Sequence, residues 1–242
     1  MSISNSQRVA ARISGVSGLL AVAIVIVANY ALLDPLIVPR DASETARNFM
    51  AHQTQVRVAL TCFLSYSASV IVLLTALYTV LKPIDPMLAL VAALLRLVHA
   101  LLWSFSTLNL LGALRTLGGT SYLQSFEPSQ LQAFARLNIS AIFDDYYIGL
   151  PFFGLAATVC SYLWLRSGYI PRMLAIFGIV SSAWCVICAF GFLMFPDLDK
   201  AVNAYWFDSP MALFEVIVSF WLLVMGLPRG VIHTSPGEHE RP

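Results

Sequence analysis

Five ionisable side chains fall inside long apolar stretches of this sequence, where charged groups are rare. Arg96 and His99 lie in one stretch, Asp144 and Asp145 in another, and Glu215 in a third. A charge near the centre of a bilayer costs at least about 2.5–3.5 kcal/mol on insertion scales, so such groups usually face a bundle interior and pair there. These residues are therefore the candidate site, and ion pairs that only hold helices together are the alternative.

The depth of each charged residue in its helix indicates its partner. At the helical rise of about 1.5 Å per residue, Arg96 lies about 15 Å, His99 about 20 Å and Glu215 about 21 Å from the expected cytoplasmic boundary. Asp145 lies about 31 Å from the same boundary, near the outer edge. We therefore expect a buried ion pair between Arg96 and Glu215 near the midplane, which would be costly to break.

One face of the helix that carries Arg96 gathers further candidates. His99 follows Arg96 by three residues and Trp103 follows His99 by four, so the three form a stripe. The ordinary pKa of histidine suits proton transfer, which makes His99 a candidate catalyst. The alternative is a histidine that bonds a neighbouring helix. Asn109, on another face near the outer end, is a candidate binding residue or a second helix-to-helix hydrogen bond.

The string Asp144-Asp145-Tyr146-Tyr147 is the most unusual local sequence. Adjacent residues on a helix point about 100° apart, so one aspartate is expected to line a cavity and the other to reach the interface. Tyrosines are typical of that interface. Pro151 follows and is expected to kink the helix near Tyr147.

The charges in these stretches do not balance. If Asp144, Asp145 and Glu215 were all ionised against Arg96, the group would carry a net charge of −2. Either some acids keep their protons because they are desolvated, or a cation neutralises them. Both outcomes favour a functional site over a purely architectural one.

The composition is that of a membrane protein. Of 242 residues, 59% are hydrophobic and 11% are charged, against about 25% charged in soluble domains. A net charge of +1 gives no electrostatic case for nucleic-acid binding. The four cysteines all fall in apolar stretches, so a disulfide framework is not expected. Cys185 and Cys188 are interpreted as packing residues, with thiol chemistry as the weaker alternative.

Six apolar stretches are long enough to cross a membrane as helices. They cover residues 13–33, 57–81, 87–114, 137–165, 171–194 and 210–227. The sequence thus predicts an all-α, polytopic membrane bundle at 1–227, with short cytoplasmic turns, longer outer loops and a disordered cytoplasmic tail at 228–242. Two groups of small residues resemble close-packing seams. The first is Ser14, Gly15 and Gly18, and the second is Thr61, Ser65 and Ser69.

The two long loops contain helix-start signals. Asp41 is expected to cap a short helix on the outer surface, with Glu44 closing a capping box. Glu127-Pro128 predicts a helix that runs directly into the fourth span. Arg8 and Arg12 precede the first span and favour cytoplasmic termini, although seven basic residues against six on the other side give only a weak bias.

Five short strings occur along most of the chain. They are DPLIVP at 34–39, RLVH at 96–99, IGLPFFG at 148–154, LRSGYIPR at 165–172, and Glu215 followed by FWLLVMG at 220–226. Together they resemble DUF4386, a family of bacterial six-helix membrane proteins of unknown function, over residues 10–227. The resemblance implies the six-helix count, a bacterial inner-membrane location and charged positions at Arg96 and Glu215. It implies no activity, and the Asp144-Asp145 pair departs from the family pattern.

The leading functional hypothesis is a membrane-embedded enzyme that uses a buried carboxylic acid on a lipophilic substrate. A cyclisation or isomerisation, for example of a terpenoid, is the reaction expected. Glu215, Asp144 or Asp145 would supply the proton, with His99 as a further catalytic candidate. The substrate would contact Arg96, Trp103, Asn109, Tyr146, Tyr147 and Trp221. The aromatic rings among these side chains would stabilise a carbocation.

Two other classes of function remain open at this point. One is a small proton- or cation-coupled transporter, in which the same acids bind the coupling ion. The other is a non-catalytic membrane partner or lipid-binding protein. In each case the expected partners are the bilayer and a lipophilic small molecule. No metal and no cofactor are expected, and a homo-oligomer is left open.

Overall fold

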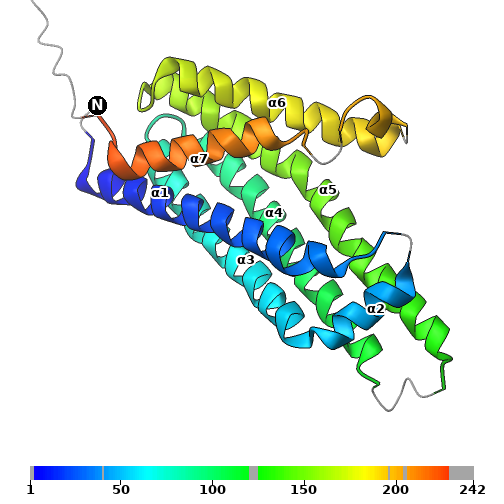
Figure 1. Ribbon diagram of the computed structural model, residues 1–242. Helices are drawn as coiled ribbons and strands as arrows, with labels where there is room; N and C mark the ends of the chain where they lie inside the picture. The colour runs from blue at the N-terminus through cyan, green and yellow to red at the C-terminus, as the bar shows by residue number, and fades with distance from the viewer. Residues whose placement is uncertain (1–2, 40, 120–124, 196, 204–205, 229–242) are drawn as a thin grey trace, which may run out of the picture.

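The computed structural model describes residues 3–39, 41–119, 125–195, 197–203 and 206–228. Across these ranges the chain is helical and contains no strand (Figure 1). The predicted all-α membrane bundle is confirmed. The predicted tail at 228–242 lies, apart from Pro228, outside the described residues.

Each predicted apolar stretch forms a helix. The elements are α1 (Asn5–Ile26) continued by the π-helical η1 (Val27–Leu33) and the 3-10 turn η2 (Asp34–Leu36), α2 (Ala42–Ala51), α3 (Gln53–Leu81), α4 (Pro86–Leu117), α5 (Pro128–Ser167), α6 (Arg172–Met194), η4 (Leu198–Lys200) and α7 (Ser209–Val224). Five segments, α1 with its extension, α3, α4, α5 and α6, are long and apolar enough to span a membrane. The chain is therefore a multi-pass membrane protein.

The sixth apolar stretch is shorter than expected. Its helix α7 has 16 residues, which corresponds to about 24 Å. A bilayer core is about 30 Å thick. The helix begins at Ser209, directly after Asp208, which occupies the N-cap position.

Side chains and glycines set the helix boundaries near the site. Asp85 accepts a hydrogen bond from the Leu88 amide (3.1 Å) and Pro86 follows it, so α4 begins there. Gly168 has φ +64° and ends α5 in the left-handed conformation. Helix α5 begins at Pro128, as predicted, and continues without a break through Pro151.

Helix α2 confirms the predicted cap at Asp41 and corrects the predicted capping box. The Asp41 carboxylate caps it by accepting a hydrogen bond from the Glu44 amide (2.9 Å). The capping box is wrong, because the Glu44 carboxylate pairs with Arg47 instead. Phe49 on this helix is fully buried within the protein.

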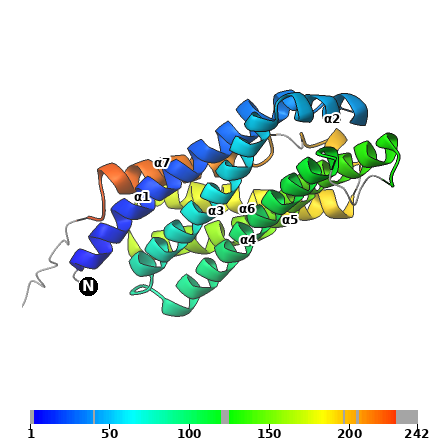
Figure 2. The ribbon, with the colours of Figure 1, turned by 90° about the horizontal axis from the view of Figure 1, so that it is seen from below.

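The helices pack as a closed ring. Around the ring, each of α1, α3, α4, α5, α6 and α7 contacts the next, and α7 returns to α1. Helices α4 and α5 run side by side over much of their length (Figure 2). We call the end of the bundle with Asn5 and Val224 the terminal end, and the opposite end, with α2, the loop end.

Helices α1 and α7 meet closely near the terminal end. A Cβ atom on Gly15 would lie 2.6 Å from the carbonyl oxygen of Ser219, so only glycine permits this approach. The predicted seam at Gly15 and Gly18 is thus confirmed. The second predicted seam is wrong, because Thr61 and Ser65 are exposed and their hydroxyls bond to their own helix.

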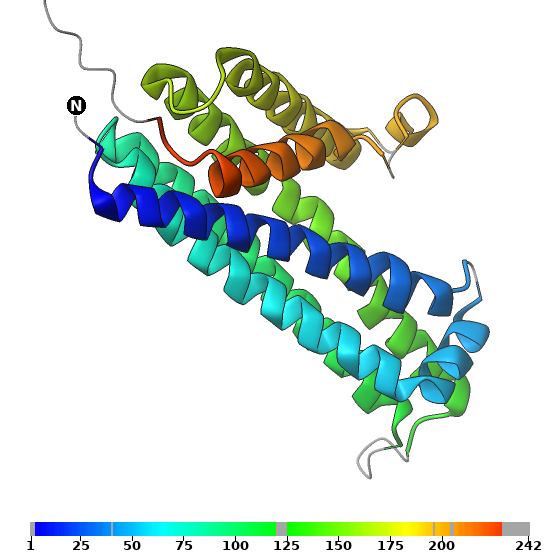
Figure 3. The ribbon, with the colours of Figure 1, turned by 60° about the vertical axis from the view of Figure 1, so that its left-hand side comes forward.

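Toward the loop end, α1 and α7 diverge, and α5 crosses the space between them (Figures 1 and 3). One buried apolar cluster, which includes Trp164, Leu163 and Leu222, fills the terminal end. A second, which includes Phe49, Phe63 and Leu110, fills the loop end. The candidate site lies between these two clusters.

Candidate functional site

A cavity of about 320 Å³ lies inside the helix ring. Helices α1, α3, α4, α5 and α7 supply its walls, which are mainly apolar. This volume is at the low end of the range of about 300–1,000 Å³ for small-molecule sites. The polar side chains that line it are Asn29, Tyr30, Asp34, Tyr66, Arg96, His99, Trp103, Tyr146, Tyr147, Asp208 and Glu215.

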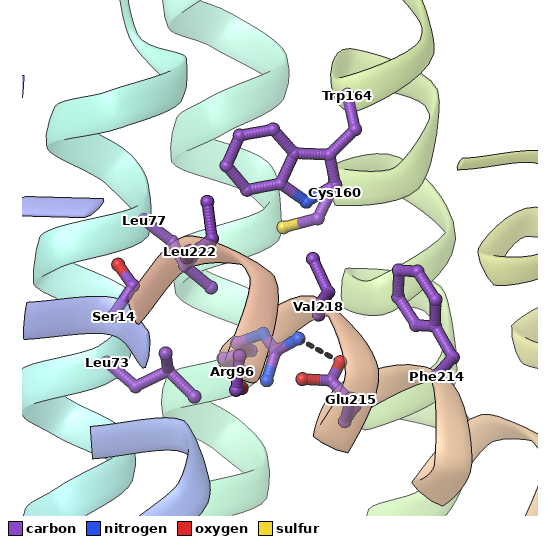
Figure 4. Close-up of a pocket in the computed structure, with 11 residues that line it drawn as sticks. Ser14, Leu73, Leu77, Arg96, Cys160, Trp164, Phe214, Glu215, Val218 and Leu222 are labelled. Carbon is purple, nitrogen blue, oxygen red and sulfur yellow. Dashed lines mark hydrogen bonds and ion pairs between the residues drawn. The ribbon is translucent and has the colours of Figure 1, made fainter. Parts of the chain in front are cut away.

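The predicted ion pair between Arg96 and Glu215 is confirmed. The Arg96 Nη2 atom on α4 lies 2.5 Å from the Glu215 Oε1 atom on α7 (Figure 4). Both residues are buried, with 2% and 7% exposed. The guanidinium also lies 4.9 Å from the ring centroid of Phe153. The Glu215 carboxyl group is therefore already engaged by Arg96.

Three buried N–H groups at the site have no hydrogen-bond partner among the described residues. They are Nε and Nη1 of Arg96 and Nε1 of Trp103. A side pocket of about 10 Å³ lies beside Arg96 and Glu215 and is also lined by Ser14 and Ser219 (Figure 4). Such a volume suffices for about one water molecule. Buried donors normally have partners. The side pocket leaves room for a water or a ligand atom beside Arg96.

His99 holds three helices together. Its Nδ1 atom lies 3.2 Å from the carbonyl oxygen of Gly149 on α5, and its Nε2 atom lies 3.0 Å from the Tyr66 hydroxyl on α3. A carbonyl only accepts, so Nδ1 donates to Gly149 and the neutral ring accepts from Tyr66 through Nε2. The ring also stacks on Phe153 at a centroid distance of 4.8 Å. Both nitrogens are used, and this geometry favours the hydrogen-bonding role over catalysis.

The carboxylate of Asp208 is the acid that the sequence reasoning missed. The Tyr146 hydroxyl donates a hydrogen bond to its Oδ2 atom. Burial raises the pKa of the Asp208 carboxyl, and the hydrogen bond from Tyr146 opposes that rise. Within the described ranges, Asp208 forms no ion pair with a basic side chain. As far as the described residues go, the cavity therefore contains an acid without a basic ion-pair partner.

The aromatic side chains form a continuous wall from His99 to Asp208. The ring centroids of Trp103 and Tyr66 are 4.8 Å apart, and those of Trp103 and Tyr146 are 6.2 Å apart. Tyr147 adjoins Tyr146 at 5.5 Å. Of the four aromatic residues expected around one cavity, Trp103, Tyr146 and Tyr147 line it and Trp221 does not.

The structure does not bring four of the predicted residues to the cavity. Asp144 is exposed. The Asp145 Oδ2 atom accepts hydrogen bonds from Asn109 Nδ2 (2.8 Å) and Ser106 Oγ (3.1 Å), so it joins α5 to α4. Trp221 packs against the apolar cluster of the terminal end. Neither Asp144 nor Asp145 lines the cavity, and the alternative role for Asn109, a bond to a neighbouring helix, is the one observed.

Sequence reasoning missed Asp208, Tyr66 and Phe153. Asp208 stands just outside the apolar stretch at 210–227, but an aspartate directly before Ser209-Pro210 is a helix-start signal. Tyr66 is a lone tyrosine in the middle of an apolar stretch, whose hydroxyl needs a partner when it is buried. Phe153 carries no such signal, because phenylalanine is common in apolar helices.

The cysteines are free thiols, and they differ in how close they lie to the site. Cys185 and Cys188 are free, buried and part of an apolar cluster with Met211 and Phe207. Cys160 lines the side pocket. In the portion of the chain that the structure covers, no three His, Cys, Asp or Glu side chains are placed to hold a metal ion.

The chain belongs to DUF4386, a family described as a domain of unknown function. The family model matches residues 13–226, which run from α1 through the end of α7. No curated protein and no solved structure matches the chain. Membership therefore assigns no activity and leaves it to be argued from the cavity.

Proposed function

We propose that this DUF4386 protein is a membrane-embedded enzyme that transfers a proton to a lipophilic substrate held in the cavity. One observation carries the proposal: an apolar cavity among spanning helices contains a carboxylic acid, Asp208, that forms no ion pair with a basic side chain of the described residues. An apolar pocket with a few convergent polar groups is the best starting hypothesis for an active site.

Asp208 is the proposed proton donor. Burial raises the pKa of its carboxyl, so the protonated form persists to higher pH than in an exposed aspartate. The hydrogen bond from Tyr146 orients the carboxyl group. This assignment transfers the donor role from Glu215, whose carboxylate is already paired with Arg96.

An isomerisation or cyclisation fits these groups. The proton leaves Asp208 and forms a C–H bond with a carbon–carbon double bond, which leaves a carbocation. Aromatic faces stabilise such a cation by cation–π attraction, and Trp103, Tyr146 and Tyr147 supply them. Loss of a proton from a neighbouring carbon, back to the Asp208 carboxylate, completes the reaction without any co-reactant. A terpenoid-like substrate has this chemistry.

The other charged and polar groups hold the cavity in shape. The Arg96–Glu215 pair connects α4 to α7, and the Tyr66–His99–Gly149 bonds connect α3, α4 and α5. Rigid walls favour catalysis because substrate and acid are then held in a reactive geometry. These residues are positioning residues in this proposal.

The orientation in the membrane is part of the proposal. Arg8 and Arg12 flank the start of the first span and favour cytoplasmic termini in a bacterial inner membrane. The loop end of the bundle, with the Asp208 side of the cavity, then faces outward.

A transporter is the competing function, because an acid without a basic partner could also bind a proton or a cation in transit. Asp208 and Asp34 both line the cavity, and neither forms an ion pair in the described parts of the chain. The two functions differ in whether a substrate changes its covalent structure.

The test compares Asp208→Asn with Asp144→Asn, a matched change of an exposed aspartate outside the cavity. Purified protein in lipid nanodiscs is incubated with farnesol, geranylgeraniol and host lipid extract, and products are followed by mass spectrometry. We expect isomerised or cyclised products of unchanged mass with the wild type and Asp144→Asn, and none with Asp208→Asn. Equal turnover by Asp208→Asn refutes the proposal. Asp208-dependent proton or cation flux in vesicles, without any product, establishes the transporter instead.

A further inference from the structure

The cavity reaches the lipid-facing surface of the bundle. Ile26, Tyr30 and Phe143 line it, yet their side chains are 50%, 46% and 46% exposed. They come from α1, η1 and α5, in the region where α1 and α7 diverge and α5 crosses between them (Figures 1 and 3). In a membrane-spanning bundle, exposed apolar side chains of this kind contact lipid. We call this apolar opening the side mouth.

One edge of the side mouth has an unusual backbone. Residues Val27–Leu33 form a π-helix of seven residues at the end of α1. Such segments are rare, and short ones are frequent at functional sites. This segment contributes Asn29, Tyr30 and Leu33 to the cavity wall. The departure from α-helical geometry therefore coincides with the opening.

The size of the cavity limits what can enter completely. At about 320 Å³ the cavity is at the low end of the range for small-molecule sites. A long-chain lipid is larger than this. Only its polar end and the first part of its chain fit inside, and the rest must extend through the side mouth into the bilayer.

The polar groups select the kind of head group. Trp103 is buried, its Nε1–H has no partner among the described residues, and it lines the cavity, so it requires an acceptor oxygen. Three acids, Glu215, Asp208 and Asp34, line the cavity together with Arg96, which pairs with Glu215. This excess of acids disfavours a phosphate or carboxylate head. An uncharged hydroxyl oxygen can accept the hydrogen bond from Trp103 without adding a negative charge beside these acids.

We propose that the substrate is a long-chain alcohol that enters through the side mouth from the leaflet on the loop-end side. Its hydroxyl oxygen accepts a hydrogen bond from Trp103 Nε1, and its chain extends between η1 and α5 into the lipid. This inference rests on the proposed function where it calls the alcohol a substrate. Binding of the alcohol does not itself require turnover. On the proposed orientation, the leaflet is the outer one.

The test uses a photoactivatable hexadecanol that carries a diazirine next to its hydroxyl group. Wild-type protein in nanodiscs is irradiated with this probe, and labelled peptides are identified by mass spectrometry. We expect labels on the parts of α5 and α7 near Tyr146 and Asp208. Excess hexadecanol should compete, whereas butanol and palmitate at the same concentration should not.

Two tryptophan substitutions distinguish the side mouth from general lipid contact. Ile26→Trp fills the opening, and Val16→Trp adds the same bulk at a 53% exposed position of α1 outside the cavity. We expect labelling to fall about tenfold in Ile26→Trp, a change of about 1.4 kcal/mol, and to stay unchanged in Val16→Trp. Gel filtration and thermal unfolding establish that both variants are folded.

Labels confined to lipid-facing peptides, or equal labelling of both tryptophan variants, overturn the proposal. Trp103→Phe adds a second check, because it should weaken labelling by the alcohol probe and leave a diazirine hexadecane unaffected. Asp144→Asn, at an exposed position outside the cavity, should label as strongly as the wild type. Labelling without turnover therefore refutes only the proposed enzyme, and turnover without labelling refutes only the side mouth.

Discussion

Removing one partner of the Arg96–Glu215 pair should destabilise the bundle strongly. Both side chains are buried and their charged atoms are 2.5 Å apart. Loss of one partner leaves the other charge uncompensated, which typically costs about 3–5 kcal/mol. In Glu215→Gln the amide oxygen still accepts a hydrogen bond from Arg96, so this variant should fall at the low end. Arg96→Met, which leaves Glu215 alone, should fall at the high end.

A double-mutant cycle measures this coupling. Thermal unfolding in nanodiscs should show both single variants less stable, with a loss of about 3 kcal/mol corresponding to roughly 6–12 °C. The double variant Arg96→Met/Glu215→Gln should be more stable than the sum of the two losses predicts, because no charge remains unpaired. Additive losses, or a wild-type Tm in Arg96→Met, would refute the reasoning.

The exposed pair of Arg47 and Glu44 is the matched control. The Arg47 side chain is 73% exposed, and exposed ion pairs contribute at most about 1 kcal/mol. Glu44→Gln should therefore unfold close to the wild type. A loss as large as that of Glu215→Gln would show that burial is not the cause.

Two further predictions follow from the site and the seam. Because burial raises the pKa of Asp208, turnover should persist above the ordinary aspartate pKa of about 3.9 and decline as pH rises through the raised value; a rate that increases over that range would contradict Asp208 as the acid. Gly15→Ala places a Cβ atom 2.6 Å from the Ser219 carbonyl oxygen and should destabilise the protein by about 1–3 kcal/mol, measured by thermal unfolding; wild-type stability would show that α1 and α7 can separate without cost.

The helices and the central ion pair were predictable because they depend on quantities fixed along the chain. A run of apolar residues determines where a spanning helix lies, as at 57–81 and 171–194. The constant helical rise determines depth, which is why Arg96 and Glu215 could be matched from residue counts alone. Both predictions needed no knowledge of how the helices rotate about their axes.

The rest of the site depends on that rotation. Asp144 and Asp145 lie at the right depth for the outer part of the cavity, but α5 turns Asp144 outward and Asp145 toward Asn109. Asp208 joins the cavity from the position directly before Ser209, the first residue of α7, and a hydropathy pattern does not reveal which way that side chain points. The π-helical geometry of η1 also depends on the packing around it and has no clear local signal in the sequence.

The short length of α7 has a consequence for the choice of membrane. A helix of about 24 Å in a hydrocarbon layer of about 30 Å creates a hydrophobic mismatch, which thinning of the bilayer or sinking of the helix end relieves. Asp208 stands at this end, so the thickness of the host bilayer acts on its hydration. If this carboxyl group carries the proposed chemistry, we expect turnover to depend on lipid chain length, because thicker bilayers keep the group drier.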